Sequence, residues 1–164
     1  MWDRSENQIT LVLIRHGATK SNIEHRYLGK MDELLSKEGE RQLVEYKKLH
    51  LYPNIDFLFT SPMKRCIQTA NILYPELQPV QMKEWEEMDF GAFEGKNYVE
   101  LQGNKLYQAW IDSNGTLPFP EGESREEFIT RCNKGFRGMV EKVEQIKEEG
   151  RKTIGMIVHG GTIM

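Results

Sequence analysis

The sequence of 164 residues is 38% hydrophobic and 29% charged, which excludes a membrane-embedded or a disordered chain. Its net charge of -3 gives no electrostatic reason to expect a nucleic-acid partner, and no segment is apolar for long enough to cross a bilayer. The polar N-terminus lacks the apolar core of a signal peptide, so we expect a cytoplasmic protein that folds as a single domain over residues 1–164.

The first expected strand covers residues 9–14, because a short run of Leu, Val and Ile is typical of a strand buried in a parallel sheet. After a polar loop, Ser36 predicts the start of a helix. Leu43, Tyr46 and Leu49 follow at helical spacing, and they should form the apolar stripe of that helix.

A second strand is expected at residues 57–59. Ser61 is followed by a proline, a pair that is typical of a helix start. We therefore expect Ser61 to cap a helix that reaches Leu73 and stops before Pro75. Val80 then begins a short strand that leads into an acidic stretch.

The second half of the chain contains a weak helical pattern around residues 106–111 and a strong one after it. Ser124 and Glu127 have the spacing of a capping box, and the helix that they open should end at Gly150. The apolar positions of this helix are Ile129, Cys132, Phe136, Met139, Val140, Val143 and Ile146. A last strand is expected at residues 154–158.

The order of these elements predicts the fold class. Strands alternate with helices, which indicates an α/β protein with a mostly parallel sheet covered by helices on both faces. Cys66 and Cys132 have neither the spacing of a metal site nor that of a redox pair, which favours two free thiols.

Two of the expected strands end in a histidine that is followed by a glycine. Arg15 and His16 come directly after the first strand, and His159 comes directly after the last one. Ligands of open α/β sheets bind at the carboxyl ends of the strands, so these residues should meet in one crevice. Arg15 can offer a planar fork to a phosphoryl group, and Gly17 should let the backbone approach the ligand.

Arg65 supplies a third cationic group, beside Lys64, in the first turn of the helix after the second strand. Cations are disfavoured at that end of a helix, so their presence there suggests an anion site. Two solvated surface cations are the alternative for this segment taken alone. Considered with Arg15, His16 and His159, Arg65 favours a pocket for an oxyanion.

Paired histidines also suggest a metal site, which we do not expect here. Neither His16 nor His159 has a second histidine or cysteine at ligand spacing, and the nearby arginines would repel a cation. His25 and His50 lie in unrelated polar surroundings. We expect neither a metal nor any other cofactor.

Five blocks of the sequence, in this order, resemble the signature of the histidine phosphatase superfamily, which is also called phosphoglycerate mutase-like. The blocks are residues 15–19 with Asn22, residues 29–39 with Gln42, residues 61–65 with Thr69 and Ala70, residues 87–95, and residues 159–162. The resemblance covers nearly the whole chain from Ile9 onward. It implies a three-layer α/β/α sandwich and an enzyme that forms a phosphohistidine.

The resemblance also implies a role for each residue of the site. His16 would attack the phosphorus through one ring nitrogen while a backbone carbonyl holds the other. The phosphoryl oxygens would be held by Arg15, Asn22, Arg65, His159 and the amide of Gly160. Glu87 stands where the family places the acid that protonates the leaving group. The nearby Glu84, Glu86 and Asp89 should raise the cost of ionising Glu87.

The short connection after Gly95 is similar to the phosphatase branch of this superfamily, in particular to the α-ribazole phosphatases of cobalamin biosynthesis. We therefore expect a phosphomonoesterase that hydrolyses α-ribazole 5′-phosphate or a similar small phosphate ester. Two alternatives remain, phosphoryl transfer of the phosphoglycerate mutase type and a non-catalytic protein that binds a phosphorylated ligand. The expected partner is a small phosphorylated metabolite, with neither a nucleic acid nor a membrane.

The sequence departs from the family pattern at its end. It stops at Met164, soon after the last block, and lacks the usual C-terminal helix. The missing helix would leave apolar surface exposed. Either the sequence is a fragment, or the protein covers that surface by pairing with another copy, and we favour a homodimer.

Overall fold

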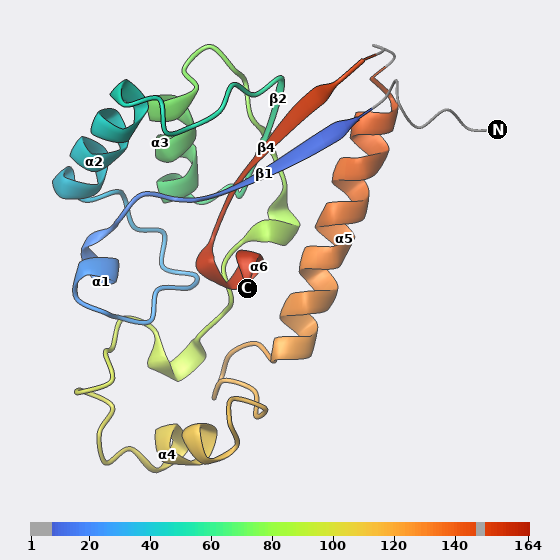
Figure 1. Cartoon of the computed structure of the whole chain (residues 1–164). Coiled ribbons are helices and arrows are strands. Elements are labelled where there is room, and N and C mark those ends of the chain that lie inside the picture. The colour runs from blue at the N-terminus through green and yellow to red at the C-terminus, as the bar shows by residue number, and fades with distance from the viewer. Residues whose placement is uncertain (1–7, 147–149) are drawn as a thin grey trace.

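The computed structural model describes residues 8–146 and 150–164. Its centre is a four-stranded sheet in which every pair of neighbouring strands is parallel and the order is β1-β4-β2-β3 (Figure 1). The strands are β1 (Ile9–Arg15), β2 (Phe57–Thr60), β3 (Val80–Gln81) and β4 (Lys152–Val158). The predicted α/β fold with a parallel sheet is confirmed.

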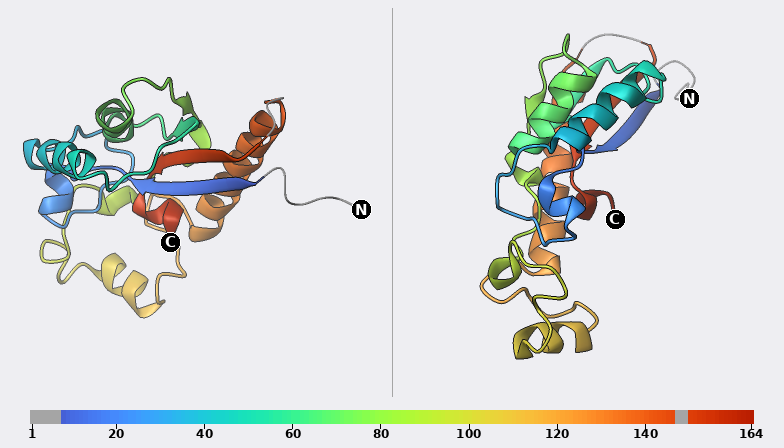
Figure 2. Two further views of the ribbon diagram at one scale, coloured as in Figure 1. Left: turned by 45° about the horizontal axis from the view of Figure 1, so that its top comes forward. Right: turned by 90° about the vertical axis from the view of Figure 1, so that its left-hand side faces the viewer.

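Helices lie on both sides of this sheet, which makes the three layers of the expected sandwich. The α-helices are α1 (Lys20–Ile23), α2 (Lys37–Lys48), α3 (Lys64–Leu73), α4 (Lys105–Asp112), α5 (Arg125–Glu144) and α6 (Gly160–Ile163). Two single turns of 3-10 helix, η1 (Lys83–Trp85) and η2 (Gly91–Phe93), belong to the connection between β3 and α4. Helices α2 and α3 cover one face, and α5 runs along the other (Figures 1 and 2).

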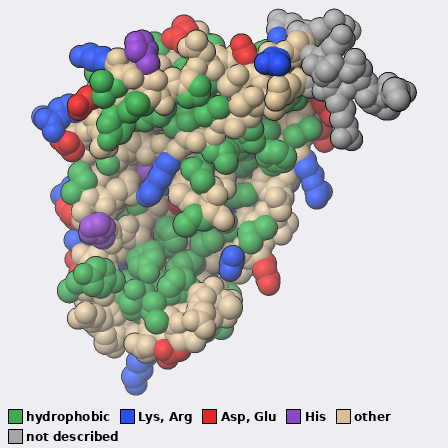
Figure 3. Space-filling model, viewed as in Figure 1, with side chains coloured by type: hydrophobic (Ala, Val, Ile, Leu, Met, Phe, Trp, Pro, Cys, Tyr) green, Lys and Arg blue, Asp and Glu red, His purple; other side chains and the backbone are tan. Residues whose placement is uncertain are grey.

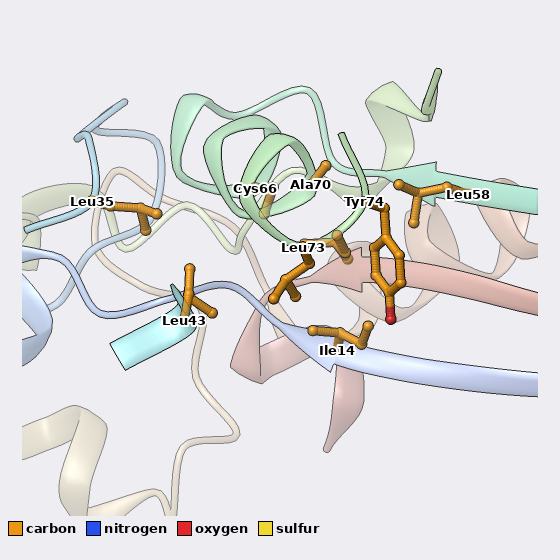
Figure 4. Packing of buried hydrophobic residues seen from close by; sticks show 9 residues of the cluster. Ile14, Leu35, Leu43, Leu58, Cys66, Ala70, Leu73 and Tyr74 are labelled. Atoms are coloured by element: carbon orange, nitrogen blue, oxygen red, sulfur yellow. The ribbon is translucent and has the colours of Figure 1, made fainter. Parts of the chain in front are cut away.

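Each face of the sheet carries one hydrophobic core cluster, because successive side chains of a strand point to opposite faces. A third cluster is built on Phe93, Leu101 and Phe119 from the connection between β3 and α5. On the first face, strand residues pack against α2 and α3 (Figure 4). This cluster contains Ile14, Leu35, Leu43, Leu58, Cys66, Ala70, Leu73, Tyr74 and Ile157. On the other face, η1 and α5 pack on the sheet through a cluster of Phe59, Met82, Trp85, Met139, Ile154, Met156 and Val158.

The register of the sheet brings three strand ends to one edge. Arg15 pairs with Val158, and Thr60 pairs with Ile157. Two main-chain hydrogen bonds continue the pairing past the strands, from the His16 amide to the Val158 carbonyl at 3.1 Å and from the Ser61 amide to the Ile157 carbonyl at 3.0 Å. Residues that follow β1, β2 and β4 therefore lie side by side.

Two of the predicted helix starts are confirmed. Ser36 caps α2, where its hydroxyl accepts a hydrogen bond from the Gly39 amide at 2.9 Å. Ser124 and Glu127 form the expected capping box at the start of α5. Each cap satisfies backbone N–H groups of the first turn, which have no partner within the helix.

The predicted cap of α3 is wrong. The helix begins at Lys64, its N-cap is Met63 rather than Ser61, and the Met63 side chain makes no capping hydrogen bond. Asp32 supplies that bond from a distant loop, because its carboxylate accepts the Lys64 amide at 2.7 Å. Ser61 is instead used in the site described below.

The apolar stripes of two helices are shorter than predicted. Leu43 is buried, but Tyr46 and Leu49 are 36% and 61% exposed, because Leu49 lies past the end of α2 and the Tyr46 hydroxyl accepts a bond from Gln42 at the surface. Helix α5 ends at Glu144, well before Gly150, and residues 147–149 lie outside the described residues.

Helices cover both faces of the sheet as predicted, but on the α5 side β1 stays partly exposed. Ile9, Leu11 and Leu13 of β1 point to that side and are 57%, 38% and 46% exposed, since α5 packs on β2 and β4. None of the helices within residues 8–146 and 150–164 has the length and hydropathy that crossing a bilayer requires.

Candidate active site

A cavity of about 560 Å³ lies at the carboxyl edge of the sheet. Five residues that the sequence predicts for the site line it, namely Arg15, His16, Asn22, Glu87 and Gly160. They come from the end of β1, from α1, from the loop after η1 and from the start of α6. The register of the sheet places the first and the last of these segments next to each other.

His16 has one ring nitrogen fixed and the other open. The Gly17 carbonyl can only accept, so the contact of 2.8 Å to Nδ1 places the ring hydrogen there and leaves the lone pair on Nε2. The pKa of His16 is lowered to about 4, chiefly by burial and in part by the positive charges of Arg65 and Arg15, while the bond to the Gly17 carbonyl opposes the shift. The ring is therefore uncharged near pH 7 and can act as a nucleophile.

Gly17 has a packing role, and the predicted approach of its backbone to a ligand stays a prediction. A Cβ atom at this position would lie 2.7 Å from Cδ1 of Leu43 and 3.3 Å from Cδ2 of Leu35. The missing side chain therefore lets the loop pack closely against Leu35 and against Leu43 of α2. The Gly17 amide donates to the Thr69 hydroxyl at 3.0 Å, which fixes the loop from α3.

Arg65 and His159 lie beneath this cavity and do not line it. Both residues are completely buried. The Arg65 guanidinium donates to the carbonyls of Gly29 and Met31, at 2.9 Å each, and to Nδ1 of His159 at 3.4 Å. These bonds use three of its five N–H groups.

The ring of His159 is committed on both sides. Nδ1 accepts from Arg65, so the hydrogen is on Nε2, which donates to the Ser61 hydroxyl at 2.8 Å. Burial and the charge of Arg65 lower the pKa of His159 to about 2, so this ring is also uncharged. The ring centres of His16 and His159 lie 5.2 Å apart. Direct contacts of Arg65 and His159 with a phosphoryl group stay a prediction.

Asn22 offers its amide hydrogens to the cavity because its oxygen is already used. The Thr19 amide donates to Oδ1 at 3.1 Å, and together these residues form a capping box at the start of α1. Arg15 lies close by at the mouth of the cavity, and a Cβ atom on Gly160 would lie 3.5 Å from its Cζ. Amide, guanidinium and backbone N–H donors therefore converge on one space.

Glu87 is the acidic residue of the cavity and is only 8% exposed. Its carboxylate accepts hydrogen bonds from the Met88 amide at 2.9 Å and from the Gly161 amide at 3.5 Å. Burial raises the pKa of Glu87, while these two bonds and the charges of Arg65 and Arg15 oppose that increase.

The raised pKa of Glu87 has a different cause from the predicted one, since burial produces it and the neighbouring acids do not. Glu84 lies 3.7 Å from Lys134, and Asp89 lies 2.6 Å from Lys30, so two of these acids are paired with cations.

Sequence reasoning missed several residues that support the site. Ser61 holds His159, and Thr69 bonds both to the Gly17 amide and, at 2.7 Å, to the Arg65 carbonyl. Thr19 followed three residues later by Asn22 is a capping signal that was available in the sequence. Contacts between distant segments, such as the one from Ser61 to His159, carry no local signal.

The outer wall of the cavity is apolar. It contains Tyr27, Leu28, Met88 and Phe90 from two loops and Ile163 and Met164 from the end of the chain. Arg26 also lies there, but its charge is matched by Glu24 and Glu100, each at 2.6 Å. A second cavity of about 500 Å³ is lined in part by Trp110, Phe119 and Phe128, and it shares Met88, Gly161 and Met164 with the first.

The described residues contain no group of three His, Cys, Asp or Glu side chains that could hold a metal ion. The functional groups that meet in the cavity are instead one free imidazole nitrogen, hydrogen-bond donors and one carboxyl group. This set suits the transfer of a phosphoryl group to nitrogen and then to water.

Comparison with known proteins agrees with this chemistry. The sequence matches the family profile of the histidine phosphatase superfamily (branch 1) over residues 11–164. The uncharacterized phosphatase PhoE of Bacillus subtilis is 33% identical, over 92% of this chain and 72% of that protein. A 2,3-bisphosphoglycerate-dependent phosphoglycerate mutase of Cytophaga hutchinsonii is 29% identical, over 93% of this chain and 73% of that protein.

A similar fold is found among solved structures. The α-ribazole phosphatase of Shigella flexneri has a TM-score of 0.77 and 24% sequence identity, and the match covers 93% of this chain and 75% of that chain. At this identity the likeness concerns the fold alone.

Proposed function

The chain belongs to the histidine phosphatase superfamily and is an enzyme of that superfamily, and we propose that it hydrolyses phosphate monoesters through a phosphohistidine on His16. The observation that carries the proposal is the His16 ring. Its Nδ1 hydrogen is held by the Gly17 carbonyl, its charge is suppressed by burial, and its Nε2 is open to the cavity. Each of these features makes Nε2 a better nucleophile.

The first step forms the bond from His16 Nε2 to phosphorus and breaks the bond from phosphorus to the ester oxygen. The leaving oxygen takes the proton of Glu87, whose raised pKa keeps the carboxyl group protonated over a wider range. In the second step a water attacks the phosphohistidine and gives its proton to the Glu87 carboxylate. Inorganic phosphate leaves, and His16 and Glu87 return to their starting forms.

Donors around the cavity would stabilise the charge on the phosphoryl oxygens during both steps. Arg15, the Nδ2 group of Asn22 and the Gly160 amide lie at the cavity. Arg65 would add the two N–H groups that the carbonyls and His159 leave unused. His159 would act chiefly by holding Arg65, because both of its ring nitrogens are engaged.

We propose α-ribazole 5′-phosphate, or a small ester similar to it, as the substrate. The leaving group would lie against Tyr27, Met88 and Phe90, a wall that suits a planar and uncharged body. The charge of Arg26 is matched by two carboxylates, so this wall has little to attract the carboxylate of a sugar acid.

The test is hydrolysis of a panel of phosphate esters that includes α-ribazole 5′-phosphate, 3-phosphoglycerate and phosphoserine. We expect the first to be cleaved fastest and a radiolabelled ester to leave an acid-labile label on the protein. His16→Ala should abolish both the label and the turnover. His50→Asn is the matched control, because asparagine tolerates the left-handed backbone of His50 (φ 54°) at a surface site. Turnover by His16→Ala at the wild-type rate would overturn the mechanism.

Phosphoglycerate mutase activity is the second candidate, and the relative from Cytophaga hutchinsonii favours it. The two activities differ in the acceptor of the phosphoryl group, which is water in a phosphatase and a substrate in a mutase. Incubation with 3-phosphoglycerate and 2,3-bisphosphoglycerate separates them. Rapid isomerisation with little free phosphate would replace the phosphatase proposal by the mutase one.

A further inference from the structure

One arginine outside the cavity makes an unusually complete set of hydrogen bonds. Arg131 of α5 donates Nε–H to Glu123 at 2.8 Å and one Nη2 hydrogen to the same carboxylate at 2.7 Å. Nη1 donates to the carbonyls of Glu84 and Glu86, at 2.8 Å each, and Nη2 to that of Glu87 at 3.3 Å. All five N–H groups of the guanidinium are thus used.

The acceptors of Arg131 belong to the chain segment that carries Glu87. Glu123 holds the same segment from its other end, because its carboxylate accepts the Asp89 amide at 3.3 Å and its own amide donates to the Asp89 carbonyl at 2.9 Å. We call Arg131 and Glu123 together the clamp. The clamp therefore fixes the backbone on both sides of Glu87.

The side chain of Glu87 also has little room to move. A Cβ atom on Gly161 would lie 2.6 Å from Oε1 of Glu87 and 3.2 Å from the ring of Phe128. The Phe128 ring in turn lies 4.9 Å from the Arg131 guanidinium. A shift of the backbone at residue 87 would therefore push the carboxyl group against α6 or away from the cavity.

We propose that Arg131 and Glu123 are positioning residues that hold the carboxyl group of Glu87 where it can protonate the leaving group. The inference rests on the proposed function, since it concerns the acid of that reaction. The clamp acts through geometry. The charge of Arg131 is matched by Glu123, and neither residue contributes to the raised pKa of Glu87. Neither residue lines the cavity of His16. Both line a neighbouring cavity of about 460 Å³ that shares Glu87 with it, and we assign them a positioning and not a catalytic role.

Disrupting the clamp should therefore reduce kcat/KM by an amount that depends on the leaving group of the substrate. An alkyl phosphate needs a proton on its leaving oxygen, whereas p-nitrophenyl phosphate releases a stable anion and needs little help. Arg131→Lys keeps the charge but removes the planar set of five donors. We expect it to lower kcat/KM for glycerol 2-phosphate by about 10- to 100-fold and for p-nitrophenyl phosphate by less than about 3-fold.

A double-variant cycle tests whether the loss passes through Glu87. In a Glu87→Gln background the acid is already absent, so adding Arg131→Lys should lower kcat/KM by less than about 3-fold with either ester. Lys134→Met is the matched control. It removes only an exposed ion pair of 3.7 Å between the same helix and Glu84. The kcat/KM values for both esters should therefore stay unchanged.

Each outcome decides the inference. The inference would be overturned if Arg131→Lys lowered kcat/KM equally for both esters or for neither. It would also be overturned if the reduction were as large in the Glu87→Gln background as in the wild type. The proposed function would stay intact in each of these cases. A wild-type protein that cleaves neither these two esters nor any ester of the substrate panel would overturn both the inference and the proposed function. If Arg131→Lys unfolds, the same cycle is run with Glu123→Gln, which keeps the size of the side chain. Melting temperatures show whether a variant is folded.

Discussion

His16 and His159 occupy equivalent places in the sequence, since each follows a strand and precedes a glycine, yet the structure uses them differently. His16 has one nitrogen fixed by its neighbour Gly17 and one open to the cavity. His159 has both nitrogens bound by residues of other segments, Arg65 and Ser61. The open nitrogen distinguishes the nucleophile from a residue that supports it.

The rate should depend on pH through two groups. His16 must be unprotonated to attack, so kcat/KM should fall as the pH drops through about 4, the pKa that burial gives this ring. Glu87 must hold a proton, so kcat/KM should also fall as the pH rises above the pKa of this carboxyl, which burial raises. Glu87→Gln should remove the alkaline fall and keep the acidic one. An alkaline fall that survives in this variant would exclude Glu87 as the acid.

Stability should decrease in acid because of His159. The folded state lowers the pKa of His159 from 6.5 to about 2, so below pH 6.5 only the unfolded state takes up this proton. Stability from this group is complete above pH 6.5 and is lost as the pH falls below it, by up to ~1.4 kcal/mol per pH unit. Urea unfolding at pH 5 and pH 7 should show a smaller difference for His159→Gln than for the wild type. An equal difference would contradict the lowered pKa.

At the scale of helices and loops, short elements fix the backbone of the site and orient its functional side chains. Helix α1 has only four residues, yet its capping box fixes the orientation of Asn22. Asp32 reaches α3 from a loop and caps it, which places Arg65 in the first turn. Both helices are thus started by bonds that also arrange functional side chains.

Replacing Asn22 by aspartate should separate these two roles. Asn22→Asp keeps an oxygen for the Thr19 amide but replaces the N–H donors by a negative charge that faces the phosphate. We expect stability to change by less than about 0.5 kcal/mol and kcat/KM to fall by about 10²- to 10³-fold. Asn104→Asp makes the same change at the cap of α4, away from the cavity, and should leave the rate unaltered. A similar loss in both variants would show that Asn22 acts only on folding.

The elements that local patterns specify were predicted well. Strands β1, β2 and β4 and the starts of α2 and α5 follow from runs of apolar residues and from serine caps. The start of α3 was predicted wrongly, because Asp32 caps this helix and the Ser61 hydroxyl is bound by His159.

The site follows the same division. The sequence predicts that Arg15, His16 and His159 follow the ends of strands, and the sheet brings these strand ends together. The burial of Arg65 and His159 beneath the cavity, and the Arg131 clamp, depend on contacts between distant segments that no local pattern encodes.

At the scale of the whole molecule, an apolar surface accompanies the free edge of the sheet. Figure 3 shows hydrophobic side chains gathered on the face of the molecule that carries β1 and α6. Ile9, Leu11, Leu13 and Ile163 are between 38% and 57% exposed there. Apolar surface beside an edge strand favours association, so the expected homodimer stays a prediction with a physical basis.

A single charge on this surface should weaken that association. Leu13→Lys introduces an ammonium group on β1, where the side chain is 46% exposed. We expect the apparent mass in light scattering to rise with concentration for the wild type and less steeply for the variant. Leu51→Lys, at a loop position that is 61% exposed, is the matched control and should behave like the wild type. A wild-type chain that is monomeric at every concentration would contradict the prediction.

The strand order has a consequence for biosynthesis. Strand β4 follows the other three in the chain, yet it lies between β1 and β2. While the polypeptide leaves the ribosome, β1 has no neighbouring strand to pair with until residues 152–158 have been translated. No phosphate ester can be cleaved on the ribosome before β4 emerges, because only its insertion brings the two ends of the site together.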